Sequence, residues 1–301
     1  LIPEFEELGT VLEPDDNIDF DFEITNTGNG PLQYNIEKHL RGGADLNPWE
    51  LRESFDFGQI VNDTRLQGVV FINDHFYISG SNNRVPQIYI LNRNGELIDQ
   101  FPQFEAEDTY GMKDLTWDGE WIWGSVLNTI YAFTMEGELM REIRGPFNPN
   151  NNFTWDADRE LLWLSSTTSD IVAMDRDGNI VDELERHGMR MYGFSYYSED
   201  VDDHPLYIFH KQVDIGDQIV TKMNTNTGDT LLVAILEGDA GTPNASFITN
   251  SYDIYSWVFF AMINDGPNDR LDVWQVDSRR DWFQIDPPTG TIDADESQDY
   301  V

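Results

Sequence analysis

Aspartate side chains are the groups in this sequence that come nearest to a catalytic arrangement. Asp114 follows the segment GMK, and Asp156 and Asp158 follow NNFTW, so these carboxylates stand at comparable places in neighbouring segments. Glycoside hydrolysis uses two carboxyl groups, an acid and a base or nucleophile, on either side of the scissile bond. No glutamate stands at a matching place, and 56 acidic residues bring carboxylates together by chance. A hydrolase is therefore the alternative hypothesis, and the chemistry depends on the elements that position these residues.

Nucleophilic and metal chemistry have weaker support. The histidines occur in unrelated contexts, without a HExxH motif or a closely spaced ligand pair. They are His39, His75, His187, His204 and His210. The chain has no cysteine, which excludes disulfides and zinc–thiolate sites. Small hydroxyl residues at the ends of expected strands, where they satisfy backbone hydrogen bonds, are Ser79, Ser125, Ser165 and Ser166. We expect no catalytic residue and no metal centre from these side chains.

Calcium binding is a separate question, because Asp175-Arg176-Asp177-Gly178-Asn179 matches the start of an EF-hand loop. The downstream glutamate and the flanking helices are missing, and the equivalent turns elsewhere read NRNGE and MEGE. A hairpin turn with glycine at a positive φ explains the segment better. The acidic runs EPDDNIDFD and EDVDDH are further weak Ca²⁺ candidates. We therefore expect no cofactor beyond weak Ca²⁺ binding.

A repeated phrase in the middle of the chain supplies the positioning elements. Two strand patterns, a glycine turn and a further strand recur so that Gly95, Gly137, Gly178 and Gly228 lie 42, 41 and 50 residues apart. Four-stranded propeller blades repeat about every 40 residues, and the flanking segments alternate apolar and polar residues with the period of strands. We predict an all-β, five-bladed β-propeller. Six blades remain an alternative if the long fourth repeat hides another strand pair.

The fifth repeat reaches Asp277 without a glycine turn and a fourth strand. The segment Trp49–Phe57 resembles the outer strands ELIDQF and ELMREI, and it precedes the first repeat. We expect it to pair with the last blade, because such pairing joins the ends of a propeller and removes exposed edges. The propeller is therefore predicted over residues 45–278.

Alignment of the repeats indicates which residues surround the mouth of this propeller. The predicted ligand-binding residues stand at the starts of inner strands and are Lys113, Asp114, Asn151, Asn152 and Arg190. The tryptophans at equivalent places in the repeats are Trp117, Trp121, Trp123, Trp155 and Trp163. We expect most of them to pack between blades, because a large ring buries much apolar surface there.

The ends of the chain, residues 1–44 and 279–301, have a different pattern. An NTGNGPL turn provides Asn26, Thr27, Gly28, Gly30, Pro31 and Leu32, and a later stretch provides Trp282, Pro287, Gly290 and Ile292. This pair of motifs resembles the Ig-like (BACON-like) modules of bacterial secreted and surface proteins. The resemblance implies a split Ig-like β-sandwich, formed by both ends, with the propeller inserted. The middle of the chain loosely resembles NHL-like and lactonase-like propellers. Five-bladed glycosidases of the arabinanase-like class use an Asp base and a Glu acid at the axial opening, and no glutamate stands at an equivalent inner-strand start here.

The large negative net charge indicates the solvent in which the protein works and the partners that it disfavours. With 56 acidic and 18 basic residues, the formal net charge is −38, which disfavours nucleic acids and anionic membranes as partners. Few lysines and many aspartates resemble halophilic proteins, in which salt screens self-repulsion; an acidic coat on a secreted protein is the alternative. No apolar stretch is long enough to span a membrane. From Leu1 the sequence has no signal peptide, so we expect a longer or processed product.

Two functional hypotheses follow. The first is a noncatalytic, secreted or cell-surface module for adhesion, recognition or structural assembly. Its partner would be a protein, including a second copy of this chain through strand donation, or a glycan. The alternative is a propeller glycoside hydrolase or lactonase-type hydrolase, which would need converging buried carboxylates at the mouth.

Overall fold

The computed structural model describes residues 2–3, 17–36, 46–81, 84–107, 109–213, 215–237, 241–253, 256–266, 268–278 and 285–301. The chain divides into two compact units, residues 46–278 and residues 1–45 with 279–301. In the described residues, no helix has the length and apolar character that a membrane crossing requires.

The larger unit is a five-bladed β-propeller in which each blade is an antiparallel sheet of four strands. The first two blades consist of β5 (Leu66–Ile72), β6 (His75–Gly80), β7 (Gln87–Asn92) and β8 (Leu97–Pro102), then β9 (Leu115–Trp117), β10 (Ile122–Val126), β11 (Thr129–Phe133) and β12 (Leu139–Arg144). The third and fourth consist of β13 (Asn152–Asp156), β14 (Leu161–Ser165), β15 (Ile171–Met174) and β16 (Ile180–Leu184), then β17 (Arg190–Tyr196), β18 (Leu206–Gln212), β19 (Gly216–Met223) and β20 (Thr230–Ile235). The fifth consists of β21 (Thr242–Asp253), β22 (Ser256–Asn264), β23 (Arg270–Ser278) and β4 (Leu51–Phe55).

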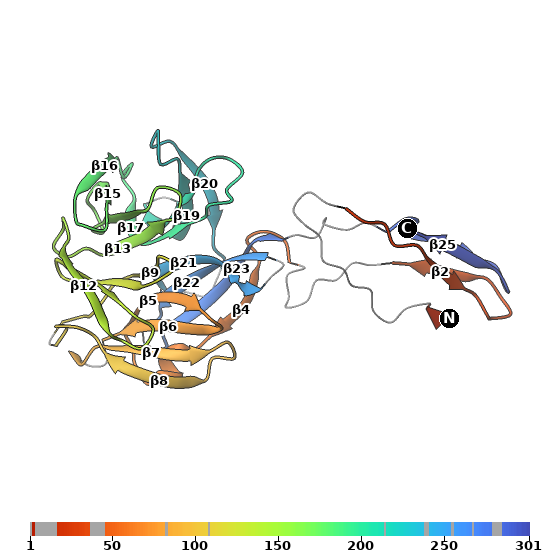
Figure 1. The fold of residues 1–301 in the computed structure, drawn as a ribbon, viewed down its shortest axis with the longest axis horizontal. Helices are drawn as coiled ribbons and strands as arrows, with labels where there is room; N and C mark the ends of the chain where they lie inside the picture. Colours follow the sequence, from red (N-terminus) through yellow and green to blue (C-terminus); the bar gives the residue numbers. More distant parts are fainter. Residues whose placement is uncertain are drawn as a thin grey trace. The chain divides into compact units, whose positions relative to one another are not determined.

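The inner strands β5, β9, β13, β17 and β21 lie towards the middle of the propeller in Figure 1 and contact one another around its axis. The alternative of six blades is wrong. The extra residues of the long fourth repeat form a turn between β17 and β18 and not another strand pair. In this turn the backbone N–H of Tyr197 donates to the carbonyl of Pro205 at 2.8 Å.

The repeated glycines stand in the turns between the third and fourth strands of four blades. Gly95, Gly137, Gly178 and Gly228 have φ values of 82°, 82°, 90° and 77°. Glycine adopts this left-handed conformation without the steric cost of a Cβ atom. The spacing that predicted the blades is therefore the spacing of the turns that require glycine.

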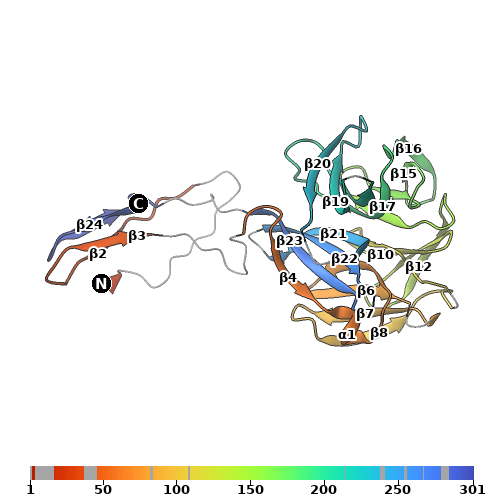
Figure 2. The same ribbon diagram turned by 180° about the vertical axis from the view of Figure 1, so that it is seen from behind.

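The ring closes through β4, which precedes the first blade in sequence and completes the fifth blade. Strand β4 pairs antiparallel with β23, with Phe55 opposite Leu271 and Glu53 opposite Val273. Figure 2 shows the orange β4 beside the blue β23. The predicted pairing of Trp49–Phe57 with the last blade is confirmed, and the short helix α1 (Phe57–Val61) then leads into β5.

The core lies between blades, in a cluster of buried apolar residues at each junction. Phe76 of the first blade and Phe260 of the fifth belong to one cluster. Trp123 of the second blade and Leu162 of the third belong to another. The remaining clusters join the first blade to the second, the third to the fourth, and the fourth to the fifth. Burial of apolar area at every junction, including the closing one, stabilises the complete ring.

The smaller unit combines strands from both ends of the chain. Strands β1 (Ile2–Pro3), β2 (Phe22–Thr25) and β25 (Ser297–Tyr300) form one sheet, and β3 (Leu32–Asn35) pairs with β24 (Thr289–Ile292). Within this unit, β2 and β25 run side by side in Figure 1. The buried side chain of Asn26 donates to the carbonyls of Gly30 at 2.8 Å and Ile292 at 2.9 Å. The NTGNGPL turn thus contacts the C-terminal segment, whereas the Ig-like sandwich stays a prediction and Trp282 lies outside the described residues.

Candidate functional site

The mouth of the propeller is the end at which the inner strands begin. Lys113 and Asp114 directly precede β9, Asn151 directly precedes β13, and Asn152 and Arg190 are the first residues of β13 and β17. These five predicted residues therefore stand at the starts of inner strands. Each blade begins with its inner strand, so these starts lie at one end of the propeller.

The hydrogen bonds of the Asp114 carboxylate span the axis of the propeller. One oxygen of its carboxylate, Oδ2, accepts hydrogen bonds from the backbone N–H of Phe153 on β13 and of Phe194 on β17, each at 3.2 Å. Its Oδ1 atom accepts from the N–H of Leu115 at 3.1 Å. Burial raises the pKa of Asp114 well above its ordinary value, and the hydrogen bonds from Phe194, Phe153 and Leu115 oppose that rise. The carboxylate thereby ties the second blade to the third and fourth.

The inner strands approach closely enough that glycine is required at two places. A Cβ atom on Gly68 would lie 2.7 Å from the backbone of Asp114, and one on Gly193 would lie 2.4 Å from the backbone nitrogen of Ser246. Beside Gly193, the hydroxyl of Ser195 donates to that of Ser246 at 2.9 Å. Fully buried backbone and side chains therefore fill the axis at Asp114.

The other candidate carboxylates serve turns at the far ends of the inner strands. Asp156 Oδ1 accepts from the N–H of Asp158 at 3.1 Å, and its Oδ2 accepts from Trp163 Nε1 at 3.0 Å. Asp158 accepts from the hydroxyl of Tyr196 at 2.9 Å. Asp156 lies three strand residues beyond Phe153, a distance of about 10 Å along an extended chain. Asp114 therefore does not converge with Asp156 or Asp158 into the acid–base pair that the hydrolase hypothesis needs.

Lys113 belongs to a group of side chains that the repeat alignment did not find. Its Nζ donates to Gln67 Oε1 at 2.8 Å and lies 5.1 Å from the centre of the Tyr110 ring. The guanidinium of Arg65 lies 5.1 Å from the same ring. Burial, followed by the nearby Arg65 charge, lowers the pKa of Lys113 to about 8. Arg65 directly precedes β5 and Tyr110 lies in the loop before β9, so their approach to Lys113 depends on how the first two blades pack together.

The remaining predicted residues stand at the inner-strand starts of the third and fourth blades. Asn152 is buried and donates to Ser165 Oγ at 2.9 Å, while Asn151 donates to Thr167 Oγ1 at 2.6 Å. The side-chain oxygens of both asparagines are buried without a hydrogen-bond donor in the described residues. Arg190 is exposed and lines a shallow depression of about 560 Å³ between β17 and the β18–β19 hairpin. None of these three side chains forms a hydrogen bond or ion pair with Lys113 in the described structure.

The hydroxyl and acidic-turn residues have structural partners. Ser79 and Ser125 donate to the carbonyls of Met112 at 2.9 Å and Asn150 at 2.7 Å, at the entry to the next blade. Asp175 accepts from the N–H groups of Asp177 and Asn179 within its own turn, both at 2.9 Å. In the described residues, no cluster of three His, Asp or Glu side chains is arranged to hold a metal ion.

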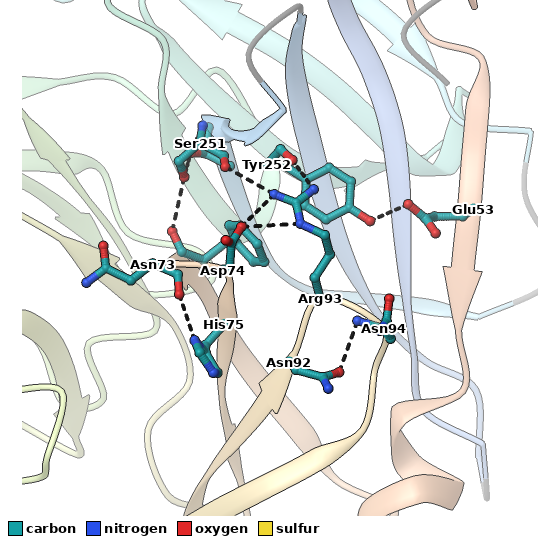
Figure 3. A network of polar contacts seen from close by, with 11 residues as sticks. Glu53, Asn73, Asp74, His75, Asn92, Arg93, Asn94, Ser251 and Tyr252 are labelled. Carbon is teal, nitrogen blue, oxygen red and sulfur yellow. Dashed lines mark hydrogen bonds and ion pairs between the residues drawn. The ribbon is translucent and has the colours of Figure 1, made fainter. Parts of the chain in front are cut away.

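A polar network centred on Arg93 holds the closing junction of the ring (Figure 3). Arg93 Nη2 donates to Asp74 Oδ1 at 2.8 Å within the first blade, and its Nη1 donates to the carbonyl of Tyr252 in the fifth. The Tyr252 hydroxyl donates to Glu53 on β4. The guanidinium also lies 4.7 Å from the centre of the Tyr252 ring. These contacts join β4, the fifth blade and the first blade, which is a structural role.

Comparisons with known proteins bear on the fold. No family model matches the sequence, and no curated protein matches it. A similar solved structure is the glutaminyl cyclase of Myxococcus xanthus, with a TM-score of 0.53 and 13% sequence identity over 76% of this chain and 97% of that one. At this identity the likeness concerns the arrangement of strands alone. By fold the chain is a five-bladed β-propeller, and its function rests on the site.

Proposed function

We propose that this protein is a noncatalytic recognition module, secreted or displayed at a cell surface, whose propeller mouth binds a glycan or a protein. The terminal unit would serve as the connector through which copies assemble. We expect no cofactor, apart from weak Ca²⁺ binding at acidic turns.

The observation that supports this proposal most directly is that both carboxylate oxygens of Asp114 already accept backbone hydrogen bonds. A catalytic carboxylate needs access to a substrate, whereas the oxygens of Asp114 are buried and accept three backbone N–H bonds. Its candidate partners Asp156 and Asp158 support turns at the other end of the strands. The carboxylates that hydrolysis would need therefore have separate structural roles.

The rim of the mouth supports binding. Arg190 is exposed beside the depression that Lys211 and Gln212 also line, and the buried oxygens of Asn151 and Asn152 lack donors in the described residues. A few polar groups placed around a rigid concave surface are typical of ligand sites.

Assembly through the terminal unit rests on its sheets. In the described structure β1 and β25 are edge strands of a small sheet, and β3 and β24 form a separate pair. An unpaired strand edge is a template for a strand from another molecule. Light scattering over a range of protein and salt concentrations tests this part, with concentration-dependent oligomers expected and a monomer at every concentration against it.

Recognition is tested by screening the whole chain against immobilised neutral glycans, acidic glycans and proteins, including the chain itself. The matched variants are Arg190→Gln at the mouth and Arg141→Gln on the outer strand β12. The Arg141 side chain pairs with Asp177 at a distance of 3.1 Å, and this pair is remote from the inner-strand starts. We expect retention of at least one ligand, weakened by R190Q but not by R141Q, and unchanged by a metal chelator. Absence of retention across the screen, or equal loss in both variants, would contradict recognition at the mouth.

A further inference from the structure

Two cations share one aromatic ring at the junction of the first and second blades. Lys113 Nζ and the Arg65 guanidinium carbon each lie 5.1 Å from the centre of the Tyr110 ring. The one hydrogen-bond acceptor that Lys113 Nζ has among the described residues is the neutral amide oxygen of Gln67, at 2.8 Å. Among the residues that the structure describes, neither Lys113 nor Arg65 forms an ion pair.

Arg65 and Lys113 differ in this respect from most cations of the propeller. Eight of its fourteen lysines and arginines pair with a carboxylate among the described residues, and Arg84, Arg144, Arg186 and Arg190 also lack such a pair there. The cations with such a partner are Arg52, Arg93, Arg141, Arg159, Arg176, Lys211, Lys222 and Arg270. Arg65 and Lys113 instead lie near each other, where like charges repel. The ring of Tyr110 compensates in part through cation–π attraction, and an anion would compensate further.

A third hydrogen-bond donor lies in the same region. The Ser81 hydroxyl is buried and has no acceptor among the described residues, and the Ser81 backbone N–H donates to the Arg65 carbonyl at 3.2 Å. Gln103 holds the neighbouring segments together, because it donates to the carbonyl of Gly80 at 3.0 Å and accepts from the N–H of Met112 at 2.7 Å. Ser81 and Lys113 are therefore each adjacent to a residue that Gln103 holds.

We propose that Arg65 and Lys113, positioned by Tyr110 and Gln67, bind an oxyanion, either a carboxylate or a sulfate, on the ligand of the propeller mouth. This proposal deepens the proposed recognition function and rests on it. Charge-assisted hydrogen bonds from ammonium and guanidinium groups are the strong ones in proteins. The acidic remainder of the chain repels anions at long range, so screening by moderate salt should favour entry of the oxyanion to this local cationic site.

Calorimetric titration with three oligosaccharides of equal length tests the proposal. The probes are an oligogalacturonate, a sulfated galactose oligomer and a neutral galactose oligomer. The variants are Lys113→Gln and Arg65→Gln, and the control is Arg141→Gln, which removes a cation that lies 5.7 Å from the Trp121 ring but pairs with Asp177. We expect one acidic probe to bind more tightly than the neutral one, and K113Q or R65Q to weaken it about tenfold or more, the effect of losing a charged hydrogen bond.

The two acidic probes distinguish a carboxylate from a sulfate. Equal binding of neutral and acidic probes, or acidic-probe binding that K113Q and R65Q leave unchanged, overturns the oxyanion proposal. If R190Q still weakens such binding, recognition at the mouth survives. Failure of every ligand in the wider screen would instead remove the recognition function itself.

A measurement on the wild-type chain keeps the test independent of folding defects in the variants. The chain has only the lysines Lys38, Lys113, Lys211 and Lys222, so the side-chain NMR signal of Lys113 can be assigned by K113R. Titration of the acidic probe should raise the pKa of Lys113 from about 8, because a bound anion favours the charged ammonium. An unchanged pKa at saturating probe places the anion elsewhere and contradicts the proposal.

Discussion

Asp114 in the second blade accepts a hydrogen bond from the backbone N–H of Phe194 in the fourth blade at 3.2 Å. These blades are not neighbours in the ring, so the bond spans the axis of the propeller. The same oxygen accepts from Phe153 in the third blade at 3.2 Å. One buried carboxylate thus links three inner strands, and its substitution separates structural and catalytic interpretations of the mouth.

Replacement of Asp114 should depend on whether an acceptor remains. D114A leaves the N–H groups of Phe153 and Phe194 buried without a partner, at a cost of about 1–3 kcal/mol each. D114N keeps an oxygen for both, but its amide NH₂ replaces the oxygen that accepts from the N–H of Leu115. It should therefore unfold at a urea concentration below that of the wild type and above that of D114A at pH 7. Equal destabilisation by D114A and D114N would contradict this account of the carboxylate.

The pH dependence of D114N has a definite sign. Because burial raises the folded-state pKa of Asp114 above its ordinary value, the native state binds more protons than the unfolded chain between those two pKa values. The contribution of Asp114 to stability therefore falls as pH rises through that window. Comparison of urea unfolding at pH 5 and pH 7 should show D114N gaining on the wild type at the higher pH, and the opposite trend would refute the assignment.

His210 should make the protein sensitive to mild acid. Its side chain is fully buried with Nε2 2.8 Å from Thr221 Oγ1, and burial lowers its pKa from 6.5 to about 4. Between these values the unfolded state binds more protons, so stability is lost as pH falls from 6.5 towards 4. At pH 5 this loss is about 2 kcal/mol. Thermal unfolding of H210Q should depend less on pH over this range than the wild type; an identical dependence would count against the prediction.

Arg93 should contribute more to stability than Arg141, although both form ion pairs with exposed aspartates. Each guanidinium also donates to a carbonyl of another blade, Arg93 to Tyr252 across the closing junction and Arg141 to Arg176 at 2.8 Å. Arg93 lies near two aromatic rings, those of Tyr252 and Phe71, whereas Arg141 lies near the Trp121 ring alone among the described residues. We expect R93Q to lower the free energy of unfolding in urea by about 0.5–1 kcal/mol more than R141Q does, which is the contribution of one additional cation–π contact. Indistinguishable unfolding midpoints for the two variants would show that the network in Figure 3 is not part of ring closure.

Salt should stabilise the native chain. The formal net charge of −38 favours expansion through self-repulsion, and the range of this repulsion falls to about 3 Å in 1 M salt. The unfolding temperature should therefore rise with sodium chloride concentration. The same series in sodium sulfate would add ion-specific effects, so sodium chloride is the better measurement. A falling unfolding temperature would contradict the importance assigned to charge repulsion.

The propeller could be predicted because its signals are local. Gly95 and Gly137 mark turns that need a positive φ, and the apolar alternation in Leu51–Phe55 resembles that of other outer strands. The mouth was predictable only as a set of strand starts. The bond from Phe194 to Asp114 joins residues 80 positions apart. Arg65, directly before β5, meets Lys113 through the ring of Tyr110, in the loop before β9. Such contacts depend on three-dimensional packing, for which the repeat pattern contains no signal.

The most direct test of noncatalytic recognition is the mass of a retained ligand after prolonged incubation with the chain. A glycan or protein fragment that binds the wild type would be incubated with the wild type and with D114N, then released and measured by mass spectrometry. Both proteins should return the ligand with its mass unchanged. Conversion of the ligand by the wild type but not by D114N would contradict the account and make Asp114 a catalytic residue.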